Sequence, residues 1–332
     1  MKLEQEILKK IFLILIFMCH IQQVWAEERR SCVAAALILP LLGGRNDTPI
    51  IPVKVNGRDV AMYVSPAFFG GLYLRESQDF TLRPGRIRGR ITENAGHTVP
   101  AEISFLDSLE IGGAKVDSPQ FIRMPGVVTQ TIDGKPLVGV IGDSILSNFQ
   151  VLIDMPHARL ALLKISRDDS CTDVEKKLLG DKVYSLPMRG DRWKIPVKID
   201  GIEKLFSLDP DTGVTVVPLG WTIIPELNQN AVAKGERVMI RYTSSLGDGV
   251  MGRKVIVHDM HVSDDELPET SVIVQDGTGD AVIGTPFFEN HQVLIDYERK
   301  IVFFSDSRNL MKSSGNNLHF AQIFSGLSEV KE

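Results

Sequence analysis

The sequence predicts an all-β chain that consists of two homologous lobes, and an internal repeat carries this prediction. Residues 51–57 (IPVKVNG) align without a gap with residues 195–201 (IPVKIDG), at an offset of 144 residues. Residues 140–154 align with residues 282–296 at an offset of 142, and both copies contain the string QVLID. Because two separate blocks agree, each copy is a unit of domain size, far longer than a solenoid or propeller repeat.

Short strand-like segments fill the first copy. They are rich in β-branched residues or alternate in polarity, and turn-forming residues separate them: residues 51–55, 60–64, 99–105, 149–153 and 159–163. Asn56-Gly57 and Asp200-Gly201 follow the two repeated strands, and such pairs tolerate the positive φ of a tight hairpin turn. Long helices do not alternate with these segments, so we expect an all-β fold.

The repeat and its flanks divide the chain into five parts. We expect a signal peptide at 1–26, an N-terminal lobe at 27–168, a linker at 169–184, a C-terminal lobe at 185–310 and a tail at 311–332. Within the linker, Thr172 and Glu175 have the spacing of a capping box. This spacing predicts a short helix that continues to Leu179.

The first residues have the pattern of an export signal. Lys9 and Lys10 precede an apolar run over residues 11–19, and Val-Trp-Ala precedes Glu27. The run is too short to span a bilayer comfortably, so we expect a cleaved signal peptide, with an uncleaved anchor as the alternative. The mature protein would be exported to the periplasm or secreted, without a membrane attachment.

The cysteines fit an exported protein. Cys19 would leave with the signal, whereas Cys32 and Cys171 would reach an oxidising compartment in which a disulfide between them is stable. The sequence leaves open whether the two sulfurs meet. No cysteine pair has the CxxC spacing of a zinc ribbon, and we expect neither a metal nor a cofactor.

The composition is that of a globular protein and argues against one class of partner. The 332 residues are 43% hydrophobic and 24% charged, with 37 Lys+Arg against 42 Asp+Glu and a formal charge of −5. There is no long basic run, which argues against nucleic acid as a partner.

The repeated hairpin, the later hydrophobic-hydrophobic-Gly block and the VLID strand occur in the same order in each lobe. In this order the chain resembles the retropepsin-like aspartic proteases, in particular bacterial exported proteins with two such lobes in one chain. The resemblance covers most of the mature chain, twice over. It implies two acid-protease lobes with a cleft between them for a peptide or protein substrate, and it places Gly142 and Gly284 at equivalent turns.

The resemblance also implies a catalytic Asp-Thr/Ser-Gly motif in each lobe, just after the strand that follows the hairpin. Two carboxylates, one from each lobe, share a proton and activate a water for attack on a peptide carbonyl. Lobe one lacks this acid, because Ser65 stands at the aspartate position and Pro66 at the Thr/Ser position. A hydroxyl does not share a proton as a carboxylic acid does.

Lobe two contains two candidate acids. The gapless repeat places Asp209 opposite Ser65, which favours Asp209. Asp211 is the alternative, although Pro210 before it lacks the amide hydrogen of a ladder residue. The literal motif consists of Asp211, Thr212 and Gly213. A plain turn is a third interpretation, because Asp, Pro and Gly are common turn residues.

A lipase-like motif offers weaker evidence, in this case for an esterase. Gly-Asp-Ser at Ser144, with Asp154 and His157, imitates a GDSL-type esterase, but the motifs lie too close together. The second copy has Thr285-Pro286 at the same place, so this block belongs to the fold, and Asp154 and its equivalent Asp296 are expected to be structural.

Two further motifs carry no chemistry. His258 and His261 would point to opposite faces of a strand and have no evident third ligand, so we expect no metal site. Residues 189–191 (RGD) are expected to form a turn before the second hairpin.

Two functions remain. The first is an aspartic-protease-like protein with peptide-bond hydrolysis that is weak or absent in the monomer. The second is a catalytically inactive pseudoprotease that binds extended peptides or a protein partner in its cleft. A homodimer that pairs two copies of lobe two would be a further way to supply a second acid.

Export gives the first testable prediction. When the full chain is expressed with its leader, the mature protein should begin at or near Glu27 and lie in the periplasm or outside the cell. Intact-mass analysis and N-terminal sequencing check this. Full-length protein recovered from the cytoplasm would contradict it.

Overall fold

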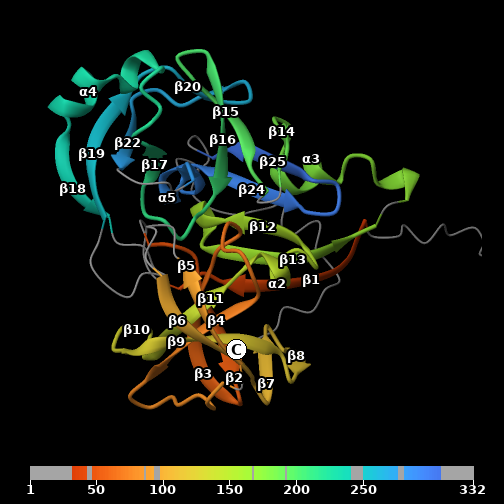
Figure 1. Cartoon of the computed structure of the whole chain (residues 1–332). Helices are drawn as coiled ribbons and strands as arrows, with labels where there is room; N and C mark the ends of the chain where they lie inside the picture. The colour runs from red at the N-terminus through yellow and green to blue at the C-terminus, as the bar shows by residue number, and fades with distance from the viewer. Residues whose placement is uncertain are drawn as a thin grey trace, which may run out of the picture.

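The computed structural model of the chain describes residues 32–42, 47–85, 87–92, 98–166, 168–190, 193–240, 250–275 and 280–307. The expected signal segment 1–26 and the tail 311–332 lie outside these residues. The fold is all-β, as predicted, and consists of three large sheets (Figure 1). Among the described helices, none is long and apolar enough to cross a membrane.

The first large sheet lies in half one, by which we mean the described residues up to 166. It is ten-stranded. Its strand order is β5 (Ile87–Thr92), β6 (Thr98–Phe105), β9 (Gln120–Val128), β4 (Leu72–Ser77), β11 (Lys135–Ile141), β3 (Arg58–Val64), β2 (Ile50–Val55), β7 (Ser108–Ile111) and β8 (Ala114–Asp117), with β10 (Thr131–Ile132) beside β11.

The second large sheet lies in half two, the described residues from 184 on. Its order is β18 (Glu236–Ile240), β19 (Val250–Val257), β22 (Thr270–Gln275), β17 (Thr215–Pro218), β23 (Val282–Ile283), β16 (Ile202–Leu208), β15 (Ile195–Ile199), β20 (Met260–Val262) and β21 (Asp265–Glu266). The repeated hairpin, β2–β3 or β15–β16, occupies the same place in both orders. The nine positions therefore correspond one by one.

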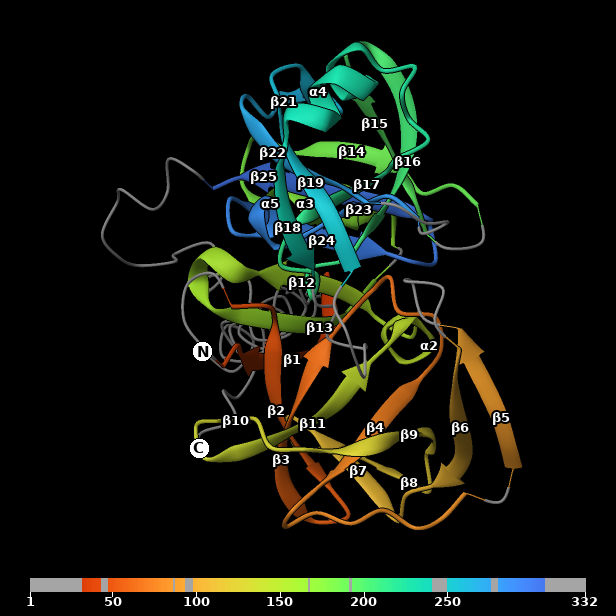
Figure 2. The same cartoon turned by 60° about the vertical axis from the view of Figure 1, so that its left-hand side comes forward.

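A six-stranded sheet joins the two halves and lies between the larger sheets (Figures 1 and 2). Its order is β1 (Val33–Pro40), β13 (Arg159–Ile165), β12 (Gln150–Asp154), β24 (His291–Asp296), β25 (Ile301–Asp306) and β14 (Tyr184–Pro187). At its centre β12 pairs antiparallel with β24, and every residue of both strands is buried. The two QVLID strings of the repeat thus bind each other.

Helices are short. They are α2 (Asp143–Leu146), α3 (Val174–Leu179), α4 (Gln229–Lys234) and α5 (Thr285–Phe288), with 3-10 turns η1 (Met155–His157), η2 (Asp169–Cys171) and η3 (Pro225–Leu227). The predicted linker helix is present as α3. It packs apolar side chains against the six-stranded sheet, including Leu178 against the cluster that contains Leu152 and Leu294.

The predicted capping box of this helix is wrong. The helix begins at Val174 after Asp173, and no side chain makes a cap hydrogen bond there. The 3-10 turn η2 directly before the helix places Thr172 outside the capping position. Burial of the apolar face of α3, and not its cap, therefore holds the helix.

Both predicted hairpin turns are confirmed. Asn56 and Gly57 have φ values of 52° and 76°, and Asp200 and Gly201 have values of 49° and 71°. Positive φ at both central residues is the geometry that matches the twist of two tightly connected strands. The repeat therefore extends to the backbone conformation of the turns.

A disulfide joins Cys32, which precedes β1, to Cys171 in η2, with the Cα atoms 5.4 Å apart. The two cysteines are separated by 139 residues, so the bond encloses half one. A cross-link of this kind removes conformational freedom from the unfolded chain, and the effect grows with the enclosed length.

The disulfide gives a stability prediction. Replacing Cys171 by serine should lower the free energy of unfolding by about 5 kcal/mol, the loop-entropy value for a sequence separation of 139 residues. Urea unfolding of the mature protein measures it. Cys32→Ser should have the same effect and the double variant no larger one, whereas unchanged stability in Cys171→Ser would contradict the role.

Candidate functional site

Ser65 and Asp209 occupy the same place in the two halves. Ser65 follows β3 and its amide donates to the carbonyl of Ile141, at 3.0 Å. Asp209 follows β16 and its amide donates to the carbonyl of Ile283, also at 3.0 Å. Because β3 pairs parallel with β11 and β16 with β23, the same backbone frame presents both side chains.

The two side chains meet. The Ser65 hydroxyl donates to Oδ1 of Asp209 at 2.8 Å, and the Thr212 hydroxyl donates to Oδ2 at 2.7 Å. Ser65 is 1% exposed and Asp209 is 5% exposed. Each carboxylate oxygen therefore accepts one hydroxyl hydrogen bond, which is how a buried carboxylate is kept in a folded protein. The pair consists of one acid and one alcohol.

Asp211 lies elsewhere. It is 4% exposed, and its negative charge acts on Tyr63 of β3 in half one. Burial, and after it the charge of Asp211, raises the pKa of Tyr63 to about 12. The residue that faces Ser65 is thus Asp209, the acid at the repeat register, while the acid of the literal motif lies near the phenol of Tyr63.

The side chain of Thr212 binds Asp209, the acid at the repeat register. The loop turns back after Asp209, because the amide of Thr212 donates to the Asp209 carbonyl at 3.1 Å. This turn brings the threonine hydroxyl to the carboxylate three residues earlier. Thr212 is visible in the sequence motif, but its hydroxyl reaches the Asp209 carboxylate only because the loop turns back.

Gly142 and Gly284 allow the loops to approach the following helices. A Cβ atom on Gly142 would lie 2.4 Å from the carbonyl oxygen of Gly70, and one on Gly284 would lie 2.1 Å from that of Val214. Both distances are too short for any side chain, so glycine is required at both positions. Gly213, by contrast, has open space where a Cβ would lie.

The residues after these glycines hold the two loops by different chemistry. In half two the Thr285 hydroxyl contacts the carbonyl oxygens of Pro210 at 2.7 Å and Thr212 at 3.1 Å. In half one Asp143 takes this place and its Oδ1 accepts the amide of Gly70 at 2.8 Å. Sequence reasoning missed both roles, although their position directly after a repeated glycine was visible.

The other sequence candidates are not part of this site. Asp154, at the end of β12, accepts from His157 at 2.6 Å and from Arg159 at 3.0 Å. Asp296, at the end of β24, pairs with Arg299. Ser144 is exposed. The aspartates thus fix the ends of the two central strands.

The two histidines each pair with an acid. His258 contacts Glu226 and His261 contacts Asp259. Among the described residues no three metal-ligating side chains come together. The backbones of Arg189 and Lys194 form an isolated antiparallel β-bridge on either side of the expected turn. Asp191 lies outside the described residues.

Compared with known proteins, the chain matches no protein-family model and no curated sequence. What the site does therefore has to follow from its own geometry. That geometry is a buried carboxylate from half two, held by a hydroxyl from each half, at the point where two repeat-related loops meet.

The glycine contacts give a matched pair of variants. Gly284→Ala should lower the free energy of unfolding by about 3 kcal/mol, because the new methyl group forces the backbone of residues 212–214 to move. Gly213→Ala, in the same loop but with free space, should change it by less than about 0.5 kcal/mol. Urea unfolding of both variants checks this. Equal effects would contradict the close approach.

Proposed function

We propose that the protein is an aspartic-protease-like protein that binds extended peptides between its two halves and has impaired peptide-bond hydrolysis. One observation carries this proposal: the Ser65 hydroxyl, and not a carboxylate, lies 2.8 Å from Oδ1 of Asp209. The internal repeat and the matching strand orders of the two large sheets support the assignment to two retropepsin-like lobes.

The geometry supports impaired hydrolysis. In an acid-protease dyad two carboxylates share one proton, because two like charges in contact do not both ionise. The shared proton lets one carboxylate accept a proton from water while the other is held as an acid. With Ser65 in place of the first acid, Asp209 retains only the accepting role, and both of its oxygens already receive hydroxyl hydrogen bonds.

Peptide binding does not need the dyad. The β5–β6 and β18–β19 pairs occupy corresponding edges of the two large sheets, and the β5 arrow points toward the other half in both views (Figures 1 and 2). On β18 and β19, Met239 and Met251 lie opposite each other and are 56% and 41% exposed. Strand edges bind extended peptides by backbone hydrogen bonds, and exposed methionines accept varied apolar side chains.

A second acid from a homodimer is less well supported. Half two already uses β24 to pair with β12 of half one, and this pairing brings Ser65 to Asp209. A second copy of half two would have to displace half one to reach the same place. The alternative function is therefore a fully inactive pseudoprotease that only binds peptide or a protein partner.

Export is part of the proposal. The Cys32–Cys171 disulfide supports an oxidising compartment such as the periplasm, where structural disulfides persist. The leader-like N-terminus and the disulfide around half one both support export. The proposed peptide-binding site would therefore meet its polypeptide partners in that compartment.

The missing acid gives a rescue prediction. The wild-type monomer should cleave unfolded protein weakly or not at all between about pH 3 and 6, since a positioned acid or base contributes about 10²–10⁴-fold. Ser65→Asp combined with Pro66→Thr should raise cleavage more than either single change, because both the acid and the motif hydroxyl return. Peptide release is measured by mass spectrometry, and efficient cleavage by the wild type would contradict the proposal.

The two lobe-two acids give a second comparison. In the rescued protein Asp209→Asn should abolish cleavage, whereas Asp211→Asn, next to Tyr63, should have the smaller effect. Peptide binding by fluorescence anisotropy serves as the folding control. Cleavage that survives Asp209→Asn would show that another residue carries the chemistry.

A further inference from the structure

Trp193 connects the two halves next to the site. It precedes β15 in half two, and its indole Nε1 donates to Oδ2 of Asp143 in half one, at 3.2 Å. The Trp193 backbone has a φ of 52°, a conformation that residues other than glycine and asparagine rarely adopt. A bulky residue in this conformation indicates that the position of its side chain matters.

Asp143 also binds the loop that carries Ser65. Its Oδ1 accepts the amide of Gly70 at 2.8 Å, and its own amide donates to the carbonyl of Phe68 at 3.0 Å. The carboxylate therefore holds loop 65–71 with one oxygen and receives the indole of the other half with the second. Loss of the indole N–H would leave one oxygen of a buried carboxylate without this donor.

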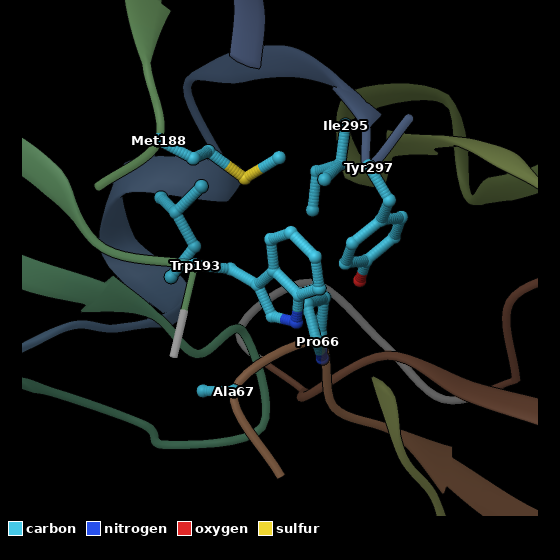
Figure 3. Close-up of a pocket in the computed structure, with 7 residues that line it drawn as sticks. Pro66, Ala67, Met188, Trp193, Ile295 and Tyr297 are labelled. Atoms are coloured by element: carbon cyan, nitrogen blue, oxygen red, sulfur yellow. The ribbon is translucent and has the colours of Figure 1, made fainter. Parts of the chain in front are cut away.

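Packing places the indole against the Ser65 loop. Figure 3 shows Trp193 beside Pro66 and Ala67 of this loop, with Tyr297 and Ile295 on the other side. The indole meets the Tyr297 ring edge to face at 5.2 Å. The remaining cavity has room for about one water molecule. The ring thus fills the space between the loop and the six-stranded sheet.

Tyr297 packs against the indole from the side of the six-stranded sheet. Its hydroxyl is buried and has no hydrogen-bond partner among the described residues. Burial, and after it the charge of Asp143, raises the pKa of Tyr297, so the phenol stays neutral. Without the indole donor, Asp143 would hold the loop from half one alone, and the bond from Ser65 to Asp209 would lose this support from half two.

We propose that Trp193 and Asp143 are positioning residues that hold Ser65 against Asp209. The indole fixes Asp143, Asp143 fixes the 65–71 loop, and the loop delivers the Ser65 hydroxyl to the carboxylate. This role does not depend on peptide binding or cleavage, so its test is separate from that of the proposed function.

The test uses a thiol at the site. Ser65→Cys in the mature, disulfide-intact protein introduces a single free cysteine, because Cys32 and Cys171 are joined to each other. Its rate of modification by a maleimide reports how often the loop leaves the carboxylate. Adding Trp193→Phe, which keeps an aromatic ring and removes the N–H, should raise this rate about tenfold, the effect of one hydrogen bond to a charged group.

Two controls and one further test variant make the result specific. Trp221→Phe, which alters the tryptophan packed on Phe206 in half two, should leave the modification rate of the thiol at position 65 unchanged. A thiol introduced by Ala61→Cys, at a fully buried position in β3, should react no faster when Trp193→Phe is added, since only the loop is released. Asp143→Asn, which keeps one acceptor oxygen, should raise the rate at position 65 as Trp193→Phe does.

Two results would overturn the proposal. One is an unchanged modification rate at position 65 in both Trp193→Phe and Asp143→Asn. The other is an equal increase at positions 61 and 65, which would show that the indole stabilises half one as a whole and does not position the Ser65 loop.

Discussion

The antiparallel pairing of β12 with β24 is the constraint on which the arrangement depends. Leu152 pairs with Leu294, and these are the residues that the sequence repeat aligns with each other. Because a residue in one half pairs antiparallel with its own repeat equivalent in the other half, an approximate two-fold axis at this pair relates the two halves. The ends of β3 and β16, which are also repeat equivalents, are thereby brought together, and the contact between Ser65 and Asp209 follows.

The backbone of the site is the same in both halves while its side chains differ. Equivalent amides, those of Ser65 and Asp209, donate to equivalent carbonyls, and Gly142 and Gly284 make equivalent close contacts. Because these interactions involve only main-chain atoms, they are the same whether the side chain is the alcohol of Ser65 or the acid of Asp209. The same loop frame thus presents an alcohol in one half and an acid in the other, which separates the stability of the fold from its chemistry.

Much of this frame could be predicted from the sequence, because the repeat, the hairpin turns and the repeated glycines are local patterns. The strand β1 (Val33–Pro40) was missed, since it is an uncharged apolar run without alternation, and Leu37 and Ile38 pack into different clusters. The register correctly brought Asp209 opposite Ser65. The contact between Trp193 and Asp143 could not be predicted, because it joins residues 50 positions apart and the repeat has Thr285 in place of Asp143 in the second copy.

One measurement tests the central claim most directly: the wild-type mature protein is titrated with a reduced, unfolded polypeptide at about pH 5, and the same samples are analysed for new chain termini by mass spectrometry. The lone carboxylate at Asp209 predicts saturable binding while the polypeptide remains essentially intact over many hours. Rapid accumulation of new termini with multiple turnovers would contradict it, as would the absence of any binding.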